Sequence, residues 1–173
     1  ATKASPFSNA GDVQLRHLNA LPPESVRTGG FRNPGFWSPD SRSFAFSDGS
    51  NLKKMLVPDG APELVATDVA TIVGGSWSDN GTLLIAGAVG RGPGLFVVPA
   101  AGGSAKRVEI PGQDFTLYWP EFLPESEDFL VLAASATNEE SEVHLATLRD
   151  GRAVDSVLLM RAVMKLIPWS SST

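Results

Sequence analysis

The chain has 173 residues, of which 42% are hydrophobic and 19% are charged, with a net charge of −5 and no cysteine. This length is typical of one domain that can bury a core, and the weak negative charge, spread along the chain, argues against nucleic acid or an anionic membrane surface as the main partner. Without cysteine there are no disulfides or thiolate metal sites, and no apolar run approaches the ~20 residues of a membrane span.

The N-terminal part of the chain carries weak structural signals. Residues 1–12 are mostly small and polar and predict a linker or disordered segment. Residues 13–18 predict one short strand, and two prolines, Pro22 and Pro23, interrupt the pattern that follows. Residues 26–34 are expected to form a loop or a weak strand.

A repeated unit then begins and predicts four short strands with turns between them. In the first repeat, about 35–70, Phe36-Trp37 ends a strand and Ser38-Pro39-Asp40-Ser41 forms a tight turn, because proline presets φ and aspartate bonds nearby backbone. Phe44 and Phe46 then alternate with small residues on one face of the next strand. The three later strands of this repeat are expected at 43–47, 52–57 and 63–66.

Two further repeats follow the same order, at about 71–112 and 115–160. The second contains the turn Ser78-Asp79-Asn80-Gly81, in which Asn-Gly is a strong hairpin signal. Residues Gly87–Gly94 are expected to form a glycine-rich loop between two strands. In the third repeat, residues 142–148 alternate clearly, while Leu158–Ile167 is the main place where a helix is expected to interrupt the strands, because Leu, Met, Ala and Lys favour helix.

The period of the repeat predicts the architecture. Trp37 and Trp77 are 40 residues apart, and Phe122 follows 45 residues later. Repeats of this length with four strands each are typical of a β-propeller, whose blades bury one another's faces. The sequence therefore predicts an all-β fold with propeller-type blades of four antiparallel strands, about three full repeats plus partial ends, in one region at 13–173. Trp37, Trp77 and Trp119 or Phe122 are expected at equivalent positions, mostly as core between blades, with an aromatic binding surface as the alternative.

The stretch Trp37-Ser-Pro-Asp-Ser-Arg-Ser-Phe-Ala-Phe46 resembles the TolB-like, WD40-like β-propeller repeat. Leu52-Lys-Lys-Met55 and Gly74-Gly-Ser-Trp-Ser78 are also similar to the propeller regions attached to bacterial eukaryotic-type serine/threonine kinases. The chain departs from the repeat where Ser41 and Ser126 replace the usual turn glycine. The resemblance implies a bacterial, extracytoplasmic or periplasmic module that binds protein or peptide.

Three repeats are fewer than the ~4–8 blades of a usual ring. Three explanations stay open at this point: the flanks complete a fourth blade, the chain is a fragment, or two chains complete one another. The strand at 13–18 is a candidate to pair with residues 163–167, which would close the ring, and an unpaired edge would favour a homodimer.

The search for catalytic chemistry finds no recognisable site. The histidines are His17 and His144, and His144 in its alternating strand predicts a surface or hydrogen-bonded histidine. No Gly-x-Ser-x-Gly motif marks a hydrolase nucleophile. We therefore predict no enzyme activity and no catalytic residue.

Metal and cofactor sites are not predicted either. Four acids lie near the turns, where carboxylates usually bond backbone: Asp40, Asp79, Glu125 and Asp128. Asp48-Gly49-Ser50-Asn51 lacks the spacing of a calcium loop, and Gly87–Gly94 lacks the Gly-Lys-Ser/Thr of a phosphate loop. The pairs Lys53-Lys54 and Lys106-Arg107 are too small for a nucleic-acid footprint.

The interpretation that follows is a non-catalytic propeller module for protein or peptide interaction, as a sensor or scaffold part of a larger bacterial protein. The alternative is the accessory propeller of an enzyme such as a prolyl-oligopeptidase-like peptidase, with its catalytic part outside this chain. A small-ligand site at the propeller axis is a third possibility, for which the sequence places no convergent polar side chains.

Overall fold

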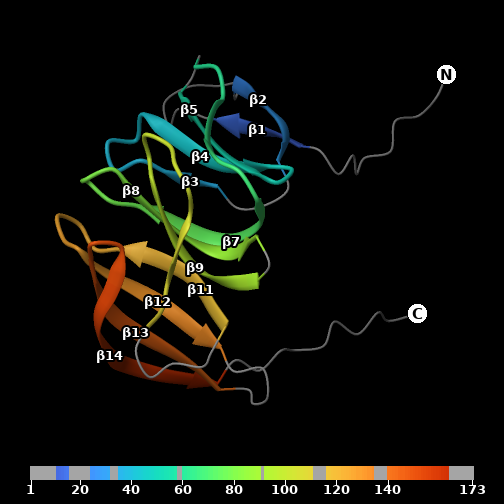
Figure 1. Cartoon of the computed structure of the whole chain (residues 1–173). Helices are drawn as coiled ribbons and strands as arrows, with labels where there is room; N and C mark the ends of the chain where they lie inside the picture. The colour runs from blue at the N-terminus through green and yellow to red at the C-terminus, as the bar shows by residue number, and fades with distance from the viewer. Residues whose placement is uncertain are drawn as a thin grey trace, which may run out of the picture.

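The computed structural model describes residues 11–15, 24–31, 35–57, 60–90, 92–110, 116–134 and 140–163. The described part is all-β and contains no helix, so it has no helix that could span a bilayer. Three antiparallel sheets of four strands follow one another along the chain, as the repeats predicted (Figure 1). We call them blades 1, 2 and 3.

The four strands of each blade are neighbours in chain order. Blade 1 contains β3 (Phe36–Trp37), β4 (Ser43–Asp48), β5 (Asn51–Leu56) and β6 (Glu63–Ala66). Blade 2 contains β7 (Val69–Trp77), β8 (Thr82–Val89), β9 (Gly92–Pro99) and β10 (Lys106–Val108). Blade 3 contains β11 (Thr116–Phe122), β12 (Asp128–Ala134), β13 (Glu140–Arg149) and β14 (Arg152–Val163).

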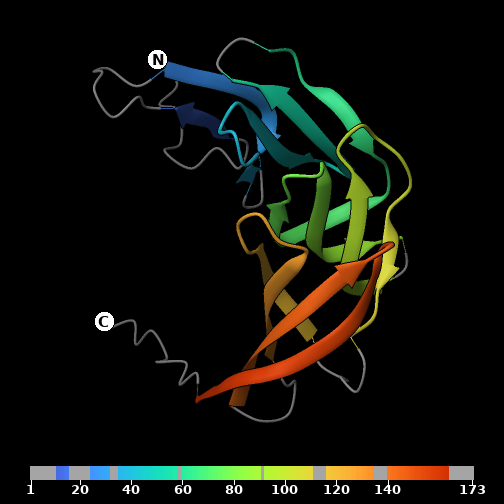
Figure 2. The same ribbon diagram turned by 90° about the vertical axis from the view of Figure 1, so that its left-hand side faces the viewer.

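The blades stack along an arc. The first strands of successive blades, β3, β7 and β11, contact one another, and Figure 2 shows them toward the concave side of the arc, with the last strands toward the convex side. We call β3, β7 and β11 the inner strands. This arrangement is that of propeller blades around an axis, so the inner strands are those nearest the axis.

The expected turns form by the expected chemistry. The Ser38 hydroxyl donates to the Asp40 carboxylate at 2.6 Å and accepts the Ser43 N–H at 2.9 Å. In blade 2 Ser78 repeats both contacts, with Asn80 and Thr82. Ser41, which stands where the repeat usually has glycine, adopts a left-handed φ of 57°. The turn therefore keeps its shape without glycine.

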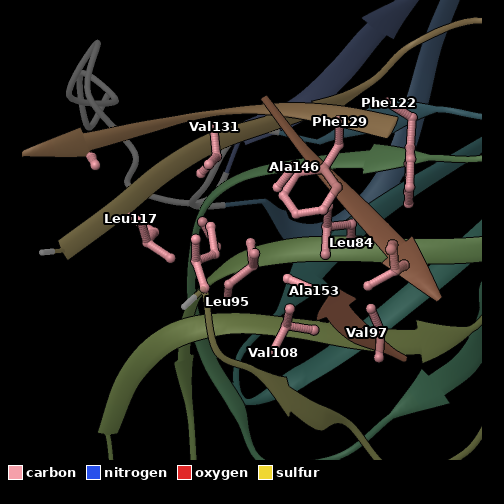
Figure 3. Packing of buried hydrophobic residues seen from close by; sticks show 14 residues of the cluster. Leu84, Leu95, Val97, Val108, Leu117, Phe122, Phe129, Val131, Ala146 and Ala153 are labelled. Carbon is pink, nitrogen blue, oxygen red and sulfur yellow. The ribbon is translucent and has the colours of Figure 1, made fainter. Parts of the chain in front are cut away.

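Hydrophobic side chains fill the spaces between the blades. One cluster joins blades 1 and 2 and includes Leu52, Ile72 and Leu83. A second cluster joins blades 2 and 3 and includes Leu84, Leu95, Val97, Phe122, Phe129 and Val131, which point toward one another in Figure 3. Phe44, Phe46 and Met55 form a third cluster on the opposite face of blade 1. Blade 2 thus buries its two faces against blades 1 and 3, as stacked repeats require.

The first strand, β1 (Gly11–Leu15), pairs with β2 (Glu24–Phe31). The expected pairing with residues 163–167 depends on residues after Val163, which lie outside the described part of the chain. Two expectations about the chain's course are wrong. Residues 158–163 continue β14 and do not start a helix, because β14 pairs with β13 from Arg152 to Val163. The Gly87–Gly94 loop is much shorter than expected, since β8 continues to Val89 and β9 starts at Gly92. His17 and residues 164–173 lie outside the described residues.

Candidate binding surface on the inner strands

Each inner strand carries one tryptophan, and two of the three are exposed. Trp37 on β3 is 41% exposed and Trp119 on β11 is 57% exposed. Trp77 on β7 is partly buried against the cluster between blades 1 and 2, and Phe122 is buried. The expectation of a core position between blades is therefore wrong for Trp37. At the third position, which the sequence assigns to Trp119 or Phe122, Phe122 is the core residue and Trp119 is exposed. Tryptophan is enriched among the residues that dominate binding energy at protein interfaces, so these two side chains are candidates for contact with a partner.

A β-bulge presents Trp119 to solvent. The register of β11 on β12 shifts between Tyr118 and Glu121, where Pro120 cannot donate a ladder hydrogen bond. Trp119 adopts a left-handed φ of 44° in this bulge. The Tyr118 and Trp119 rings are 6.0 Å apart and tilted. The bulge interrupts the alternation of inward and outward side chains along β11. The indole of Trp119 therefore lies outside the packed space between blades 2 and 3.

Gly74 on β7 lies in close contact with Trp119. A Cβ added at Gly74 would lie 2.8 Å from both Trp119 Cα and Trp119 Cδ1. Real Cβ atoms do not approach other atoms this closely, so the backbone of β11 and the indole lie directly on a residue without a side chain. The close contact fixes Trp119 against β7.

The next contact between these strands involves Ser76 and β11. The buried Ser76 hydroxyl accepts the Phe122 N–H at 3.0 Å, across 46 residues of sequence. Burial raises the pKa of the neighbouring Glu121 carboxyl above its usual value, and a hydrogen bond from Ser76 partly offsets the rise. Among the described residues no lysine, arginine or histidine forms an ion pair with Glu121.

Replacing Ser76 with alanine should lower the free energy of unfolding by about 1–3 kcal/mol, the range for a buried group left without its partner. The Phe122 N–H would lose its acceptor in a buried position. Urea unfolding followed by circular dichroism measures the change. Ser104→Ala, at an exposed loop position, is the matched control and should change stability by less than about 0.5 kcal/mol. Equal stability of both variants would show that the amide does not need Ser76.

Replacing Glu121 with glutamine should stabilise the fold at neutral pH. Because the folded-state pKa of Glu121 is raised above its usual 4.5, ionisation opposes folding: the stability of the wild type is fully present below about pH 4.5 and falls as the pH rises through the folded-state pKa. Urea unfolding of both proteins at pH 4 and pH 7 tests this. Glu121→Gln should have a higher free energy of unfolding than the wild type at pH 7, and the difference should be much smaller at pH 4. An equal difference at the two pH values would contradict a raised pKa of Glu121.

His144 is buried at 3% exposure and hydrogen-bonded at both ring nitrogens. Its Nε2 lies 2.9 Å from Glu142 Oε2, and its Nδ1 lies 3.3 Å from Ser156 Oγ. Arg161 also donates to Glu142 at 2.9 Å, and the bonds from His144 and Arg161 lower the pKa of the Glu142 carboxyl. The imidazole thus bridges Glu142 on its own strand and Ser156 on β14. All of these residues belong to β13 and β14, so they join the two strands.

The acids near the turns bond to protein groups. The Asp40 carboxylate accepts from Ser38 and from the Arg42 N–H, and these bonds lower its pKa. Asp79 accepts the Glu125 N–H at 3.1 Å and so links the turns of blades 2 and 3. Asp128 accepts from Thr147. No group of three potential metal ligands gathers in the described part of the chain.

The basic pairs and the glycine-rich hairpin also have local roles. Lys53 forms an ion pair with Asp48, and Lys54 with Glu63. Arg107 donates to the Pro93 carbonyl at 2.8 Å and lies over the Phe96 ring. Lys106 lines a hollow of about 330 Å³ between blades 2 and 3, together with the acidic Glu127 and Asp150. Because charges of both signs line this hollow, it does not favour a ligand of either charge.

Glu121 and Ser76 are the residues of this surface that the sequence analysis missed. A proline within a strand pattern indicates a bulge, so Trp119-Pro120-Glu121 was the available signal. The partner of Glu121 on β7 could not be found in this way, because Ser76 is 45 residues away in the sequence.

No family model matches the chain, and no curated protein matches it. Several solved structures match the chain. The TolB of Agrobacterium tumefaciens is 16% identical, with a TM-score of 0.65 over 82% of this chain and 53% of the other. The TolB of Acinetobacter baumannii is also 16% identical, with a TM-score of 0.65 over 90% of this chain and 39% of the other.

A prolyl endopeptidase structure is 16% identical as well, with a TM-score of 0.61 over 86% of this chain and 25% of the other. The chain thus spans about half or less of the length of these proteins. Identity at this level shows the fold and not the activity. Together with the three four-stranded sheets, the matches lead to one conclusion: the chain has the fold of consecutive β-propeller blades, similar to those in the two TolB structures.

Proposed function

We propose that this chain is a non-catalytic propeller module that binds a protein or peptide through its inner strands. The observation that carries the proposal is the exposure of two tryptophans, Trp37 and Trp119, on strands nearest the axis. Tryptophan is enriched among the residues that dominate binding energy at protein interfaces. The bulge and Gly74 hold Trp119 in place before a partner arrives, which lowers the entropy cost of binding.

Selection of peptides from a random library on the immobilised chain, followed by calorimetry, tests this function. Selected peptides should bind the wild type and lose about tenfold or more in affinity to Trp119→Ala, as for a residue of high binding energy. Leu64→Ala is the control, because Leu64 is exposed on β6 of blade 1, away from the inner strands. A selection without binders, or binders unaffected by Trp119→Ala, would contradict the proposal.

The proposal includes the larger context that the sequence suggested. Residues 13–173 would form one propeller region, acting as a sensor or scaffold within a larger bacterial protein. A second copy of the chain is a further partner in this proposal, since β14 is the last strand of its sheet and exposes Val157, Leu159 and Met160. An edge strand of this kind favours pairing between chains. Light scattering at rising concentration should show a dimer, and a constant monomer mass would contradict this part.

The second candidate function is an accessory propeller of a peptidase. The structural match to a prolyl endopeptidase favours it. In that case the coding sequence beside these 173 residues would contain an α/β-hydrolase domain with its Gly-x-Ser-x-Gly nucleophile turn. Sequencing the gene on both sides decides between the two functions, since a protein without such a domain excludes this candidate.

A further inference from the structure

Trp119 and Glu121 are both exposed on β11, which lies along β7. Gly74 contacts Trp119, and the Ser76 hydroxyl accepts the N–H of Phe122, the residue after Glu121. Gly74 and Ser76 are two residues apart in a part of β7 that pairs regularly with β8, so they share a face and are separated by about 7 Å. Trp119 contacts the first of these two positions, and the residue after Glu121 is bonded to the second, so the indole and Glu121 lie close together on the exposed side of β11.

The carboxylate of Glu121 lacks a cationic partner within the described chain. Salt bridges occupy Asp48, Glu63, Glu127 and Glu142, but none includes Glu121. An exposed carboxylate has about four acceptor positions. These positions are suited to a charged donor from outside the chain.

We propose that Trp119 and Glu121 bind an arginine side chain of the partner peptide. This inference rests on the proposed function and names the chemistry of its site. A guanidinium group stacks on an indole face and donates two parallel hydrogen bonds to a carboxylate, a combination that lysine does not match. The arrangement would give the inner-strand surface a preference for peptides with an exposed arginine beside apolar residues.

The first experiment uses N-acetyl-L-arginine amide as a probe of the ¹⁵N-labelled chain. The indole N–H signal of Trp119, assigned with Trp119→Phe, should shift in a saturable manner with the arginine probe. N-acetyl-L-citrulline amide, which has nearly the same shape without the charge, should bind at least tenfold more weakly. Equal binding of the two probes would overturn the inference.

Two variants make the role of the carboxylate testable. Glu121→Gln should lower the affinity for the arginine probe at least tenfold. Glu125 is an exposed acid on the next turn of the same blade, and Glu125→Gln should leave this affinity unchanged. Unaltered binding to Glu121→Gln would overturn the inference. Because Glu121→Gln is expected to stabilise the fold at neutral pH, its loss of binding would not reflect unfolding.

The selected peptides separate this inference from the proposed function. Peptides that require Trp119 but bind equally well after arginine is replaced by citrulline would leave the proposed function standing and overturn the arginine site. Failure of the peptide selection would contradict the proposed function, while the arginine probe would still decide whether the site exists.

Discussion

Replacing Phe129 with alanine should lower the free energy of unfolding by about 3–5 kcal/mol, the range for removing a buried phenylalanine. Phe129 on β12 is 0% exposed and lies in the cluster between blades 2 and 3 (Figure 3). Its ring also packs edge to face against Phe122, with ring centres 6.1 Å apart. The variant would lose this contact and leave a cavity between two rigid sheets. Urea unfolding at equilibrium measures the loss.

Leu159→Ala is the matched control for Phe129→Ala. Leu159 is 52% exposed on β14 of the same blade, so its truncation should cost less than about 0.5–1 kcal/mol. A small effect of Phe129→Ala would mean that blades 2 and 3 do not pack on each other in solution. A second variant, Phe129→Leu, keeps most of the volume and should recover part of the loss, which keeps the test valid if the alanine variant does not fold.

Local signals in the sequence predicted the blades well, because each strand pair depends on neighbouring residues. The turn at Ser38–Ser41 and the Asn80-Gly81 hairpin have their own backbone chemistry. The alternation of Phe44 and Phe46 placed both on one face of β4, and both belong to the same buried cluster. Such features need no knowledge of distant parts of the chain, and the four-strand order of each repeat is therefore confirmed.

Features that depend on distant contacts were not predictable in this way. Leu158–Val163 has residues that favour helix, yet pairing with β13 makes it a strand, since tertiary pairing overrides a weak local preference. Trp37 pairs with Phe44 as the buried Phe122 pairs with Phe129, yet Trp37 is exposed. Trp119 lies at a bulge in β11, which the period of the repeat does not indicate.

The binding surface illustrates the same limit. The sequence predicts Trp119 mainly as a core residue. The raised pKa of Glu121 depends on partial desolvation and on the neighbouring Ser76 of β7, neither of which follows from the local sequence. Propeller blades bring together residues that are one repeat apart in the sequence. The residues of a site between two inner strands therefore come from different repeats.

Replacing Gly74 with alanine should remove binding at the inner strands as effectively as Trp119→Ala, although residue 74 itself need not touch the partner. The new Cβ would lie 2.8 Å from Trp119 Cα and 3.0 Å from Trp119 N. Backbone atoms cannot move aside as flexible side chains do, so β11 must shift and carry the indole and Glu121 with it. We expect a tenfold or greater loss of peptide affinity and a stability cost of about 1–3 kcal/mol, typical of overpacking.

Gly92→Ala provides the control, because a Cβ added at Gly92 on β9 meets nothing within 4 Å. Calorimetry with a selected peptide and urea unfolding should both give wild-type values for this variant. If Gly74→Ala kept full affinity for the peptide, the contact with Gly74 would not be what positions Trp119. The inner-strand binding surface would then have to form only when the partner binds. A loss of affinity in Gly74→Ala with retained cooperative unfolding would instead show that the fixed position of Trp119 and Glu121 on β7 determines recognition.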